Sequence, residues 1–241
     1  MIGLGTIINT AAIILGGLPG LIFGKKIPVR LQDTLMKANG ICVLFIGIAG
    51  ALQEMFTVEN GKISTVGTMM MIGAFAIGAV IGELLNIEHH MERFGEWLKK
   101  KTKSDKDMSF VDGFVTASLT VCIGAMAVVG SIKDGINGDY SILAAKAVLD
   151  FIIILIMTAS MGKGCIFSAI PVLIFQGSIT LLSKLIEPIM TETALSYLSL
   201  TGSMLIFCVG VNLVWGKKIK VANLLPTIVV AVIWAVVENL I

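Results

Sequence analysis

Residues 141–161, SILAAKAVLDFIIILIMTASM, decide the fold class because they form an apolar run as long as a bilayer is thick. A transmembrane helix needs about 20 predominantly apolar residues, since each residue adds about 1.5 Å along the helix axis and the hydrocarbon core is about 30 Å thick. The run carries two charged residues, Lys146 and Asp150. It therefore predicts a helix that crosses a membrane.

The rest of the chain repeats this pattern. Of its 241 residues, 56% are hydrophobic and 14% are charged, whereas a soluble domain has about 25% charged residues. The mean hydropathy is +0.95. The sequence predicts an all-α polytopic membrane helix bundle of about eight transmembrane helices, forming a single domain over residues 1–241. The predicted spans lie near residues 3–23, 37–55, 65–85, 110–131, 141–161, 164–184, 194–215 and 222–240.

The lysines and arginines alternate between the two sides of this predicted bundle. If the N-terminus lies outside, 14 of the 18 fall in cytoplasmic loops, 3 on the opposite side (Lys62, Lys133 and Lys184), and Lys146 within a span. The positive-inside rule requires such a bias, so the alternation supports an even number of spans and predicts that both termini lie outside. The predicted cytoplasmic set is Lys25, Lys26, Arg30, Lys37, Arg93, Lys99, Lys100, Lys101, Lys103, Lys106, Lys163, Lys217, Lys218 and Lys220.

The longest polar segment, residues 87–107, separates the predicted third and fourth spans. Ile87, Met91, Phe94 and Leu98 recur in it at helical spacing, and lysines follow them. This pattern is typical of an amphipathic helix that lies in the membrane interface. A solvated connector fits the segment equally well, so the sequence predicts a cytoplasmic connector and leaves these two forms open.

Glycines spaced by four form small-residue surfaces on the first and third predicted spans: Gly16, Gly20 and Gly24, and Gly78 and Gly82. Small residues at this spacing let transmembrane helices approach closely, which predicts packing surfaces and a homo-oligomer. Pro19 offers a second interpretation, because it removes a backbone donor and a local unwinding there would expose backbone groups to a ligand. Packing is the better supported of the two.

The chain also resembles itself at fixed offsets. Five residues match between 5–20 and 67–82, and Gly-Lys-Lys-Ile occurs at both 24–27 and 216–219. Transporter folds often arise from repeated segments, so these matches suggest a bundle built from repeated helical hairpins. Gly-rich apolar helices also resemble one another through composition alone, and this alternative stays open.

Lys146 and Asp150 are four positions apart in the fifth predicted span. This spacing puts them on one helix face, where they can form an ion pair. A charged residue at the bilayer centre costs at least about 2.5 kcal/mol, so an intramembrane acid is by default an ion site, a proton relay or a substrate contact. The alternative is a self-neutralising pair that locks helices together. The sequence favours function and makes Lys146 and Asp150 the first candidates for a binding site.

Polar and small residues recur every four positions on one face of the predicted fourth span: Asp112, Thr116, Thr120 and Gly124. Lys133 and Asp134 form a second Lys/Asp cluster at its outer end. Because the fourth and fifth spans are consecutive and antiparallel, these residues could line one cavity together with the Lys146–Asp150 pair. Hydroxyls bonded to their own helix backbone and an ordinary polar turn explain the same pattern equally well.

Glu83, near the cytoplasmic end of the third predicted span, completes the candidate site residues. An acid beside the Gly78 and Gly82 surface could face a pore. Other isolated polar residues, such as Asn9 and Gln176, more often form interhelical hydrogen bonds than ligand contacts.

The most specific string in the chain is CIGAMAVVGSIKDG at 122–135, followed by GDYS at 138–141. Together with GTIIN at 5–9, IGELL at 81–85 and the Lys/Asp pair, it resembles the bacterial integral membrane family of unknown function number 554, the YdfK/YqgA-type proteins. The resemblance extends over nearly the whole chain. It implies a multi-pass protein of the bacterial inner (plasma) membrane and implies no activity.

Motifs of soluble enzymes are missing, because the sequence has no G-x-x-x-x-G-K-[ST], H-E-x-x-H or G-x-S-x-G. The net charge of +2 gives no reason to expect a nucleic-acid partner. The four cysteines lie in apolar runs without a C-x-x-C pair, so they are expected to be buried hydrophobic residues. We expect no enzyme activity, no cofactor and no metal.

The sequence favours a transporter or channel for a small ion or solute in the lipid bilayer, with the Lys146–Asp150 pair at its site. The alternative is a non-transporting membrane scaffold or assembly factor that acts through protein partners. A polar cavity that reaches Asp150 would favour transport, and a closed bundle with a buried structural pair would favour the scaffold.

Overall fold

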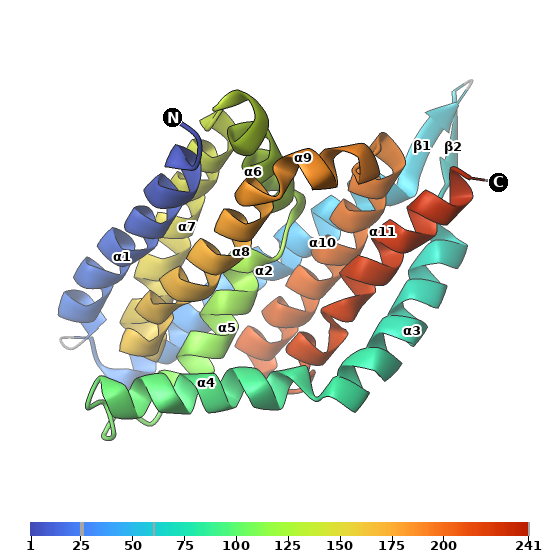
Figure 1. The fold of residues 1–241 in the computed structure, drawn as a ribbon. Coiled ribbons are helices and arrows are strands. Elements are labelled where there is room, and N and C mark those ends of the chain that lie inside the picture. Colours follow the sequence, from blue (N-terminus) through green and yellow to red (C-terminus); the bar gives the residue numbers. More distant parts are fainter. Residues whose placement is uncertain (25–26, 60, 241) are drawn as a thin grey trace.

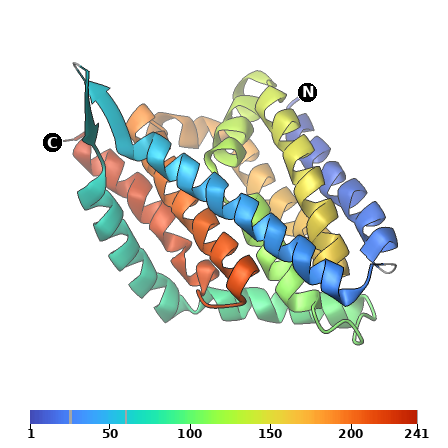
Figure 2. The same ribbon diagram turned by 180° about the vertical axis from the view of Figure 1, so that it is seen from behind.

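The structure is a computed structural model that describes residues 1–24, 27–59 and 61–240. Long helices run side by side between two ends of the molecule (Figure 1). One end carries both termini and a β-hairpin, and at the other end helix α4 lies across the base of the bundle, as the view from behind also shows (Figure 2). The ends of the chain therefore lie on the same side of the bundle.

Eleven α-helices, three short 3-10 helices and one hairpin make up the described residues. The α-helices are α1 (Leu4–Gly24), α2 (Val29–Met55), α3 (Thr68–Leu85), α4 (Ile87–Lys101), α5 (Phe110–Cys122), α6 (Ala125–Asn137), α7 (Ser141–Met161), α8 (Ala169–Leu181), α9 (Ser183–Ile186), α10 (Glu192–Trp215) and α11 (Pro226–Glu238). The 3-10 helices are η1 (Lys163–Ser168), η2 (Glu187–Ile189) and η3 (Val221–Leu224). Strands β1 (Phe56–Glu59) and β2 (Lys62–Thr65) pair antiparallel, with Phe56 opposite Thr65.

Seven helical segments of the described chain are long and apolar enough to cross a membrane. They are α1, α2, α3, α7, α10, and the continuous pairs η1–α8 and η3–α11. Helices α5 and α6 meet the same criterion only together, and they are bent by 62° at a short break. Counting this pair as one broken span gives eight. The predicted all-α polytopic bundle is confirmed.

The break corrects the prediction of one continuous helix over residues 110–131. Helix α5 ends at Cys122 and α6 begins at Ala125, so Ile123 and Gly124 connect them. Gly124 has a φ of +140°, a conformation that is nearly restricted to glycine because a Cβ atom would clash with the backbone. A single glycine thus lets the chain change direction inside the bundle.

Helix α2 begins at Val29, whereas the predicted span begins at residue 37. The prediction stopped at the first charged residues, but these belong to the helix: Lys37 pairs with Asp33 at 2.7 Å, and both side chains are half exposed. An ion pair of this spacing stabilises a helix in water, so α2 extends beyond its apolar part. Two other predicted cytoplasmic lysines, Lys25 and Lys26, lie outside the described residues.

The sequence does not predict strands β1 and β2, and α3 begins at Thr68, three residues later than predicted. The segment 87–107 forms helix α4 up to Lys101 and then turns. Leu98 is buried on the bundle side of α4, while Trp97 is half exposed and stacks on Phe94. An amphipathic helix at this end of the bundle suits a membrane interface.

Helix α1 continues through Pro19, so the local unwinding considered there does not occur. Proline is tolerated in a transmembrane helix when neighbouring helices fix it, and here α1 packs against α7, α8 and η1. The predicted glycine surfaces are packed inside the protomer: Gly20 contacts α7, and Gly78 and Gly82 contact Thr227 and Asn223. The surfaces that suggested a homo-oligomer are therefore already covered.

Helix α5 forms the centre of the bundle. Nearly all its residues from Gly113 to Val121 are buried, and it packs against α4, α7, α8, α10 and η1. Phe110 and Phe114 are among the largest fully buried side chains. The outer helices carry exposed large apolar residues, as is expected of surfaces that face lipid.

Candidate functional site: a buried ion pair and a polar vestibule

The Lys146–Asp150 ion pair lies inside the bundle. Lys146 Nζ is 2.9 Å from Asp150 Oδ1, and the two side chains are 9% and 3% exposed. Asp150 Oδ2 accepts a second hydrogen bond, from Asn9 Nδ2 of α1 at 3.0 Å. The pair expected from the four-residue spacing is thus present, and a side chain 141 residues away completes it.

Asn9 reaches Asp150 because α1 lies unusually close to α7. Gly20 and Gly24 face the carbonyl oxygens of Leu155 and Ala159, and a Cβ atom added at these glycines would lie 2.6 and 2.8 Å from them. Gly16 faces the carbonyl oxygen of Phe151 in the same way. Three glycines spaced by four therefore match three carbonyls spaced by four, which is how small residues hold transmembrane helices together.

Asp134 and Lys133 lie on different faces of α6, one buried and one exposed. Asp134 is fully buried, and its carboxylate accepts hydrogen bonds from the backbone N–H groups of Gly3 at 3.2 Å and Gly5 at 3.0 Å. A carboxylate at this place is stabilised by the unpaired N–H groups and the dipole at the start of α1. Lys133 is exposed. The structure therefore separates this predicted Lys/Asp cluster and ties Asp134 to α1.

The predicted polar stripe runs along α5 as far as Thr120. Asp112 is exposed at the α4 end, Thr116 is half-buried, and the buried Thr120 donates to the carbonyl oxygen of Thr116 at 2.7 Å. Gly124 belongs to the break and not to the stripe. The hydroxyl of Thr120 thus forms its hydrogen bond within its own helix, whereas Asp112 and Thr116 line a cavity.

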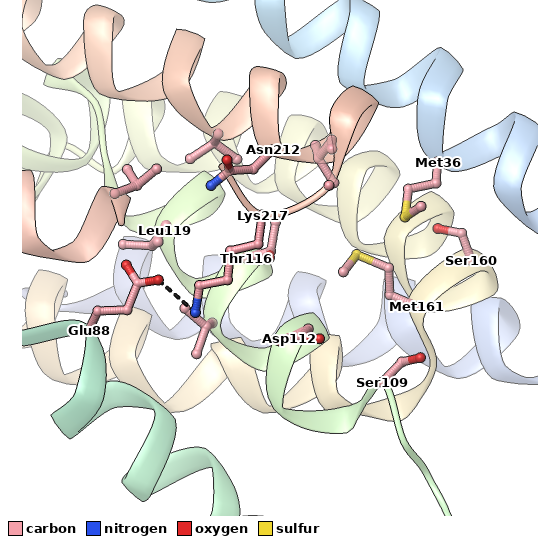
Figure 3. Close-up of a pocket in the computed structure, with 15 residues that line it drawn as sticks. Met36, Glu88, Ser109, Asp112, Thr116, Leu119, Ser160, Met161, Asn212 and Lys217 are labelled. Atoms are coloured by element: carbon pink, nitrogen blue, oxygen red, sulfur yellow. Dashed lines mark ion pairs between the residues drawn. The ribbon is translucent and has the colours of Figure 1, made fainter. Parts of the chain in front are cut away.

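That cavity, which we call the vestibule, has a volume of about 300 Å³ and lies at the α4 end of the bundle. It is lined by Met36, Glu88, Ser109, Asp112, Val115, Thr116, Leu119, Ser160, Met161, Val209, Asn212, Leu213, Gly216, Lys217 and Val221. The lining residues come from α2, α4, α5 with its N-cap residue, α7, α10, the loop after α10 and η3, and Figure 3 shows how ten of them, labelled, surround the cavity. Its deepest residue on α5 is Leu119, seven positions beyond Asp112 and about 10 Å along the helix.

An ion pair closes one side of the vestibule. Lys217 Nζ lies 2.8 Å from Glu88 Oε1, and it also pairs with Glu92 (Figure 3 shows the contact with Glu88). Burial disfavours the Lys217 ammonium, but its hydrogen bonds to Glu88 and Glu92 outweigh burial and raise the pKa of Lys217 above the ordinary lysine value. Lys217 is therefore charged at neutral pH.

The same corner of the bundle is held by a small network of polar contacts. Glu88 accepts a hydrogen bond from the backbone N–H of Ala222 at 3.1 Å and donates its own N–H to Asn223 Oδ1 at 2.8 Å. Asn223 Nδ2 and Lys220 Nζ in turn bind Glu83, at 2.6 and 2.7 Å. Glu83 is exposed there and does not line the vestibule. It joins α3 to the loop before α11.

The vestibule brings together two of the predicted site residues, Asp112 and Thr116, and its lining contains neither Lys146 nor Asp150. Met161 lines the vestibule at the end of α7, and Asp150 lies eleven residues away, which is about 16 Å along the helix. The buried pair and the vestibule are therefore two separate sites in this structure, and the vestibule is not the shared cavity that the sequence left open as one possibility.

Several residues of these two sites were not predicted as site residues. In the sequence Asn9 stands as an isolated polar residue, Glu88 and Lys217 lie in predicted cytoplasmic loops, and Asn212 lies near the end of a predicted span. The signal for Asn9 is its position on the face of α1 that carries Gly16 and Gly20, which must face a neighbouring helix. Nothing in the sequence indicates that the loop after α10 folds back against α4.

Comparison with known proteins agrees with this architecture. The family model described as "Protein of unknown function (DUF554)" matches residues 4–236. The chain belongs to this family. The resemblance predicted from the string at 122–135 and the shorter strings is thereby confirmed. No solved structure matches the chain.

Two relatives of this DUF554 protein align over nearly its whole length. The "Uncharacterized membrane protein YdfK" of Bacillus subtilis (strain 168) is 31% identical over 226 residues, which cover 94% of this chain and 93% of the relative. The "Uncharacterized protein YqgA" of Escherichia coli (strain K12) is 27% identical over 232 residues, covering 95% and 94%. The membrane description of the first relative agrees with the apolar helices found here, and the chain is a membrane protein.

Proposed function

We propose that this protein is a transporter or channel for a small ion or solute, with the Lys146–Asp150 pair at its centre. The observation that carries the proposal is the vestibule. It is a cavity inside an apolar helix bundle, lined by charged and polar side chains as well as apolar ones, and its wall includes α5, the first half of a broken helix. Broken helices at substrate sites are a recurrent feature of transporters.

The charges of the vestibule favour a cation or a polar solute. Lys217 is neutralised by Glu88 and Glu92, while Asp112 has no ion pair in the part of the chain that the structure describes. An unpaired acid at the mouth of a cavity raises the local concentration of cations. In this proposal the vestibule is one end of the path, and the Lys146–Asp150 pair lies beyond its closed inner end.

The alternative function, a non-transporting scaffold or assembly factor, has its own supporting observations. The vestibule does not reach Asp150, and a buried pair without a cavity is the arrangement that favours a scaffold. Both oxygens of Asp150 already accept hydrogen bonds, and Asp134 binds the start of α1. A purely structural pair would look the same in this conformation. Flux measurements separate the two functions, because a scaffold carries no solute.

Proteoliposomes that contain the protein are expected to conduct alkali cations, protons or small polar solutes faster than empty liposomes. The probes are internal pyranine under imposed Na⁺, K⁺ and pH gradients, and light scattering under gradients of glycerol and urea. Replacing Asp150 by asparagine removes the buried charge and keeps the shape of the side chain, so we expect the flux to fall at least about tenfold. Asp33→Asn on α2 is the control, because Asp33 forms a Lys–Asp pair of the same spacing in an exposed position.

Equal flux in the Asp150→Asn protein would remove Asp150 from the mechanism. Liposomes that show no flux above background for any of these probes, although the protein is folded and inserted, would leave the scaffold as the better function.

We further propose that the protein lies in the bacterial inner membrane with both termini outside. Lysines of α4, of the turns after it and of the loops after α7 and α10 lie at one end of the bundle, while Lys62 and Lys184 lie at the other. The end with more positive charge is retained in the cytoplasm.

A cysteine at position 62 is therefore expected to react with a membrane-impermeant maleimide on intact spheroplasts. A cysteine at position 106 should react only after the membrane is made permeable. Both variants, Lys62→Cys and Lys106→Cys, are made in a chain whose four native cysteines are alanine. The opposite labelling pattern would invert the proposed orientation.

A further inference from the structure

The Asp150 carboxylate has a side-chain oxygen beside it that lacks a hydrogen-bond partner. Asn9 is fully buried on α1, and its Nδ2 donates to Asp150 Oδ2 at 3.0 Å. The Oδ1 atom of the same amide has no partner among the residues that the structure describes. Exchanging the two amide atoms would set an oxygen against the carboxylate, so Asp150 fixes which atom is which.

Thr6 and Ser131 carry two more buried side-chain oxygens, on α1 and α6. Thr6 precedes Asn9 by one turn on the buried face of α1, and Ser131 precedes Asp134 by one turn on α6. Asp134 binds the backbone at the start of α1, so this part of α6 faces the same turns of α1. The hydroxyls of Thr6 and Ser131 are at most 3% exposed and find no partner within the described ranges.

Buried oxygens without partners are uncommon in folded proteins because each one loses its hydrogen bonds to water. Here one of them belongs to the amide that binds Asp150, and the other two lie one helical turn from Asn9 and from Asp134. Carboxylate, amide carbonyl and hydroxyl oxygens together are the ligands that hard cations prefer. A single carboxylate balances one positive charge, and a divalent ion would leave an excess charge in an apolar interior. The set therefore fits a monovalent cation that binds when the Lys146 ammonium has moved away from Asp150.

We infer that Asp150, Asn9 Oδ1 and Thr6 Oγ1, with Ser131 opposite, form a binding site for an alkali-metal cation. The Lys146 ammonium takes the place of this cation in the conformation described. The inference rests on the proposed function in that Asp150 is its ion-binding acid, and it names the class of ion and the further ligands.

The cation and the Lys146 ammonium compete in this site for one carboxylate. Lys146 Nζ holds Asp150 Oδ1 at 2.9 Å. A cation that binds both Asp150 oxygens must displace this contact, so part of its binding free energy is spent on separating the ion pair. Removing the ammonium is therefore expected to strengthen cation binding, whereas a purely structural pair predicts no cation binding in either protein.

The test is cation binding to the purified protein in detergent micelles, where flux plays no role. NaCl, LiCl or KCl replaces choline chloride at constant ionic strength, and binding is followed by calorimetric titration and by the midpoint of thermal unfolding. A cation that binds only the folded state raises the midpoint with its concentration. We expect such a rise for at least one of the three ions, and its loss in the Asp150→Asn protein.

Three variants examine the individual groups. Lys146→Met is expected to tighten binding by about tenfold, and Asn9→Leu and Thr6→Val are expected to weaken it by about tenfold each, because each loses one ligand oxygen. Thr227→Val is the matched control. Thr227 is also fully buried with a hydroxyl that lacks a partner among the described residues, but it lies on α11, which packs against α3 and α10.

Binding that is weakened by Lys146→Met, or unchanged by both Asn9→Leu and Thr6→Val, would overturn the site. If the Lys146→Met protein does not fold, the Asn9 and Thr6 variants decide alone. No response to any alkali cation in the wild-type protein would also overturn the site. Buried water molecules would then be the better explanation for the hydrogen-bond partners of these oxygens. Cation binding without flux would refute the transport function but support the cation site. Flux without cation binding would support transport and refute the cation site.

Discussion

Replacing Lys146 by methionine is expected to lower the free energy of unfolding by about 3–5 kcal/mol in choline chloride, because the buried Asp150 carboxylate then loses its opposite charge. Methionine keeps most of the length and apolar volume of the lysine side chain, so the loss reports the charge. Asp150 retains only the hydrogen bond from Asn9. Chemical unfolding in detergent micelles, followed by circular dichroism, measures the effect.

Lys37→Met is the internal control for this prediction. Lys37 and Asp33 form a pair with the same four-residue spacing at 2.7 Å, but their side chains are 51% and 50% exposed. Exposed pairs contribute about 0–1 kcal/mol, because water already solvates both charges. The ratio of the two losses in unfolding free energy therefore measures how much burial adds to a Lys–Asp contact of the same spacing.

A double variant, Lys146→Met with Asp150→Leu, is expected to recover most of the lost stability. Removing one partner of a buried pair leaves an uncompensated charge, whereas replacing both by apolar residues removes the desolvation cost as well. Losses of similar size for Lys146→Met and Lys37→Met would show that Asp150 does not depend on Lys146 for its charge balance. A double variant less stable than the single one would show the same.

The ion pair could be predicted from the sequence because it is a local feature of one helix. Positions 146 and 150 must share a face of any helix, whatever surrounds it. The contact with Asn9 could not be predicted in the same way. It depends on α1 lying parallel to α7 and so close to it that only glycine fits between the two backbones. The four-residue spacing of the glycines is evident in the sequence, but only the structure shows which helix they contact.

The vestibule was predicted only in part for a related reason. Asp112 and Thr116 recur along one helix, so their common face follows from spacing alone. Glu88 and Lys217, in contrast, meet across 129 positions because the loop after α10 turns back against α4. For the lysines that the structure describes, the charge pattern predicts which ones lie at the same end of the bundle as α4, but it contains no information about their acidic partners.

The broken helix shows a different limit of sequence analysis. Gly124 has the four-residue spacing of a continuous stripe, and it stands in an apolar segment long enough to cross the membrane without a break. Glycine is compatible with both a helix and the φ of +140° found here. The choice is made by packing, because α6 leans toward α7 and α8 while α5 stays in the centre.

The largest effect of a small substitution is expected at Gly82 on α3. A Cβ atom at this position would overlap the carbonyl oxygen of Asn223 and lie 2.6 Å from its carbonyl carbon. Because both atoms belong to backbone, no side-chain rotation relieves the clash. We expect Gly82→Ala to lower the free energy of unfolding by at least about 3 kcal/mol, measured by chemical unfolding in micelles.

Gly177→Ala on α8 makes the same chemical change where no atom lies within 4 Å of the added methyl group. There the substitution should be neutral or stabilising by about 0.5–1 kcal/mol, because alanine has less backbone entropy to lose in a helix. Opposite signs for the two variants would establish that backbone contact, and not helix propensity, makes glycine necessary at position 82.

The consequences of Gly82→Ala should extend to the vestibule. Asn223 holds Glu88 and Glu83, and the neighbouring Val221 lines the cavity. Displacing η3 would therefore loosen the contact between α3, α4 and the loop that carries Lys217. Flux through the Gly82→Ala protein is expected to change even at temperatures where it is folded, while the Gly177→Ala protein keeps wild-type flux. Wild-type stability and flux in both proteins would contradict the close contact between α3 and η3 from which this prediction is derived.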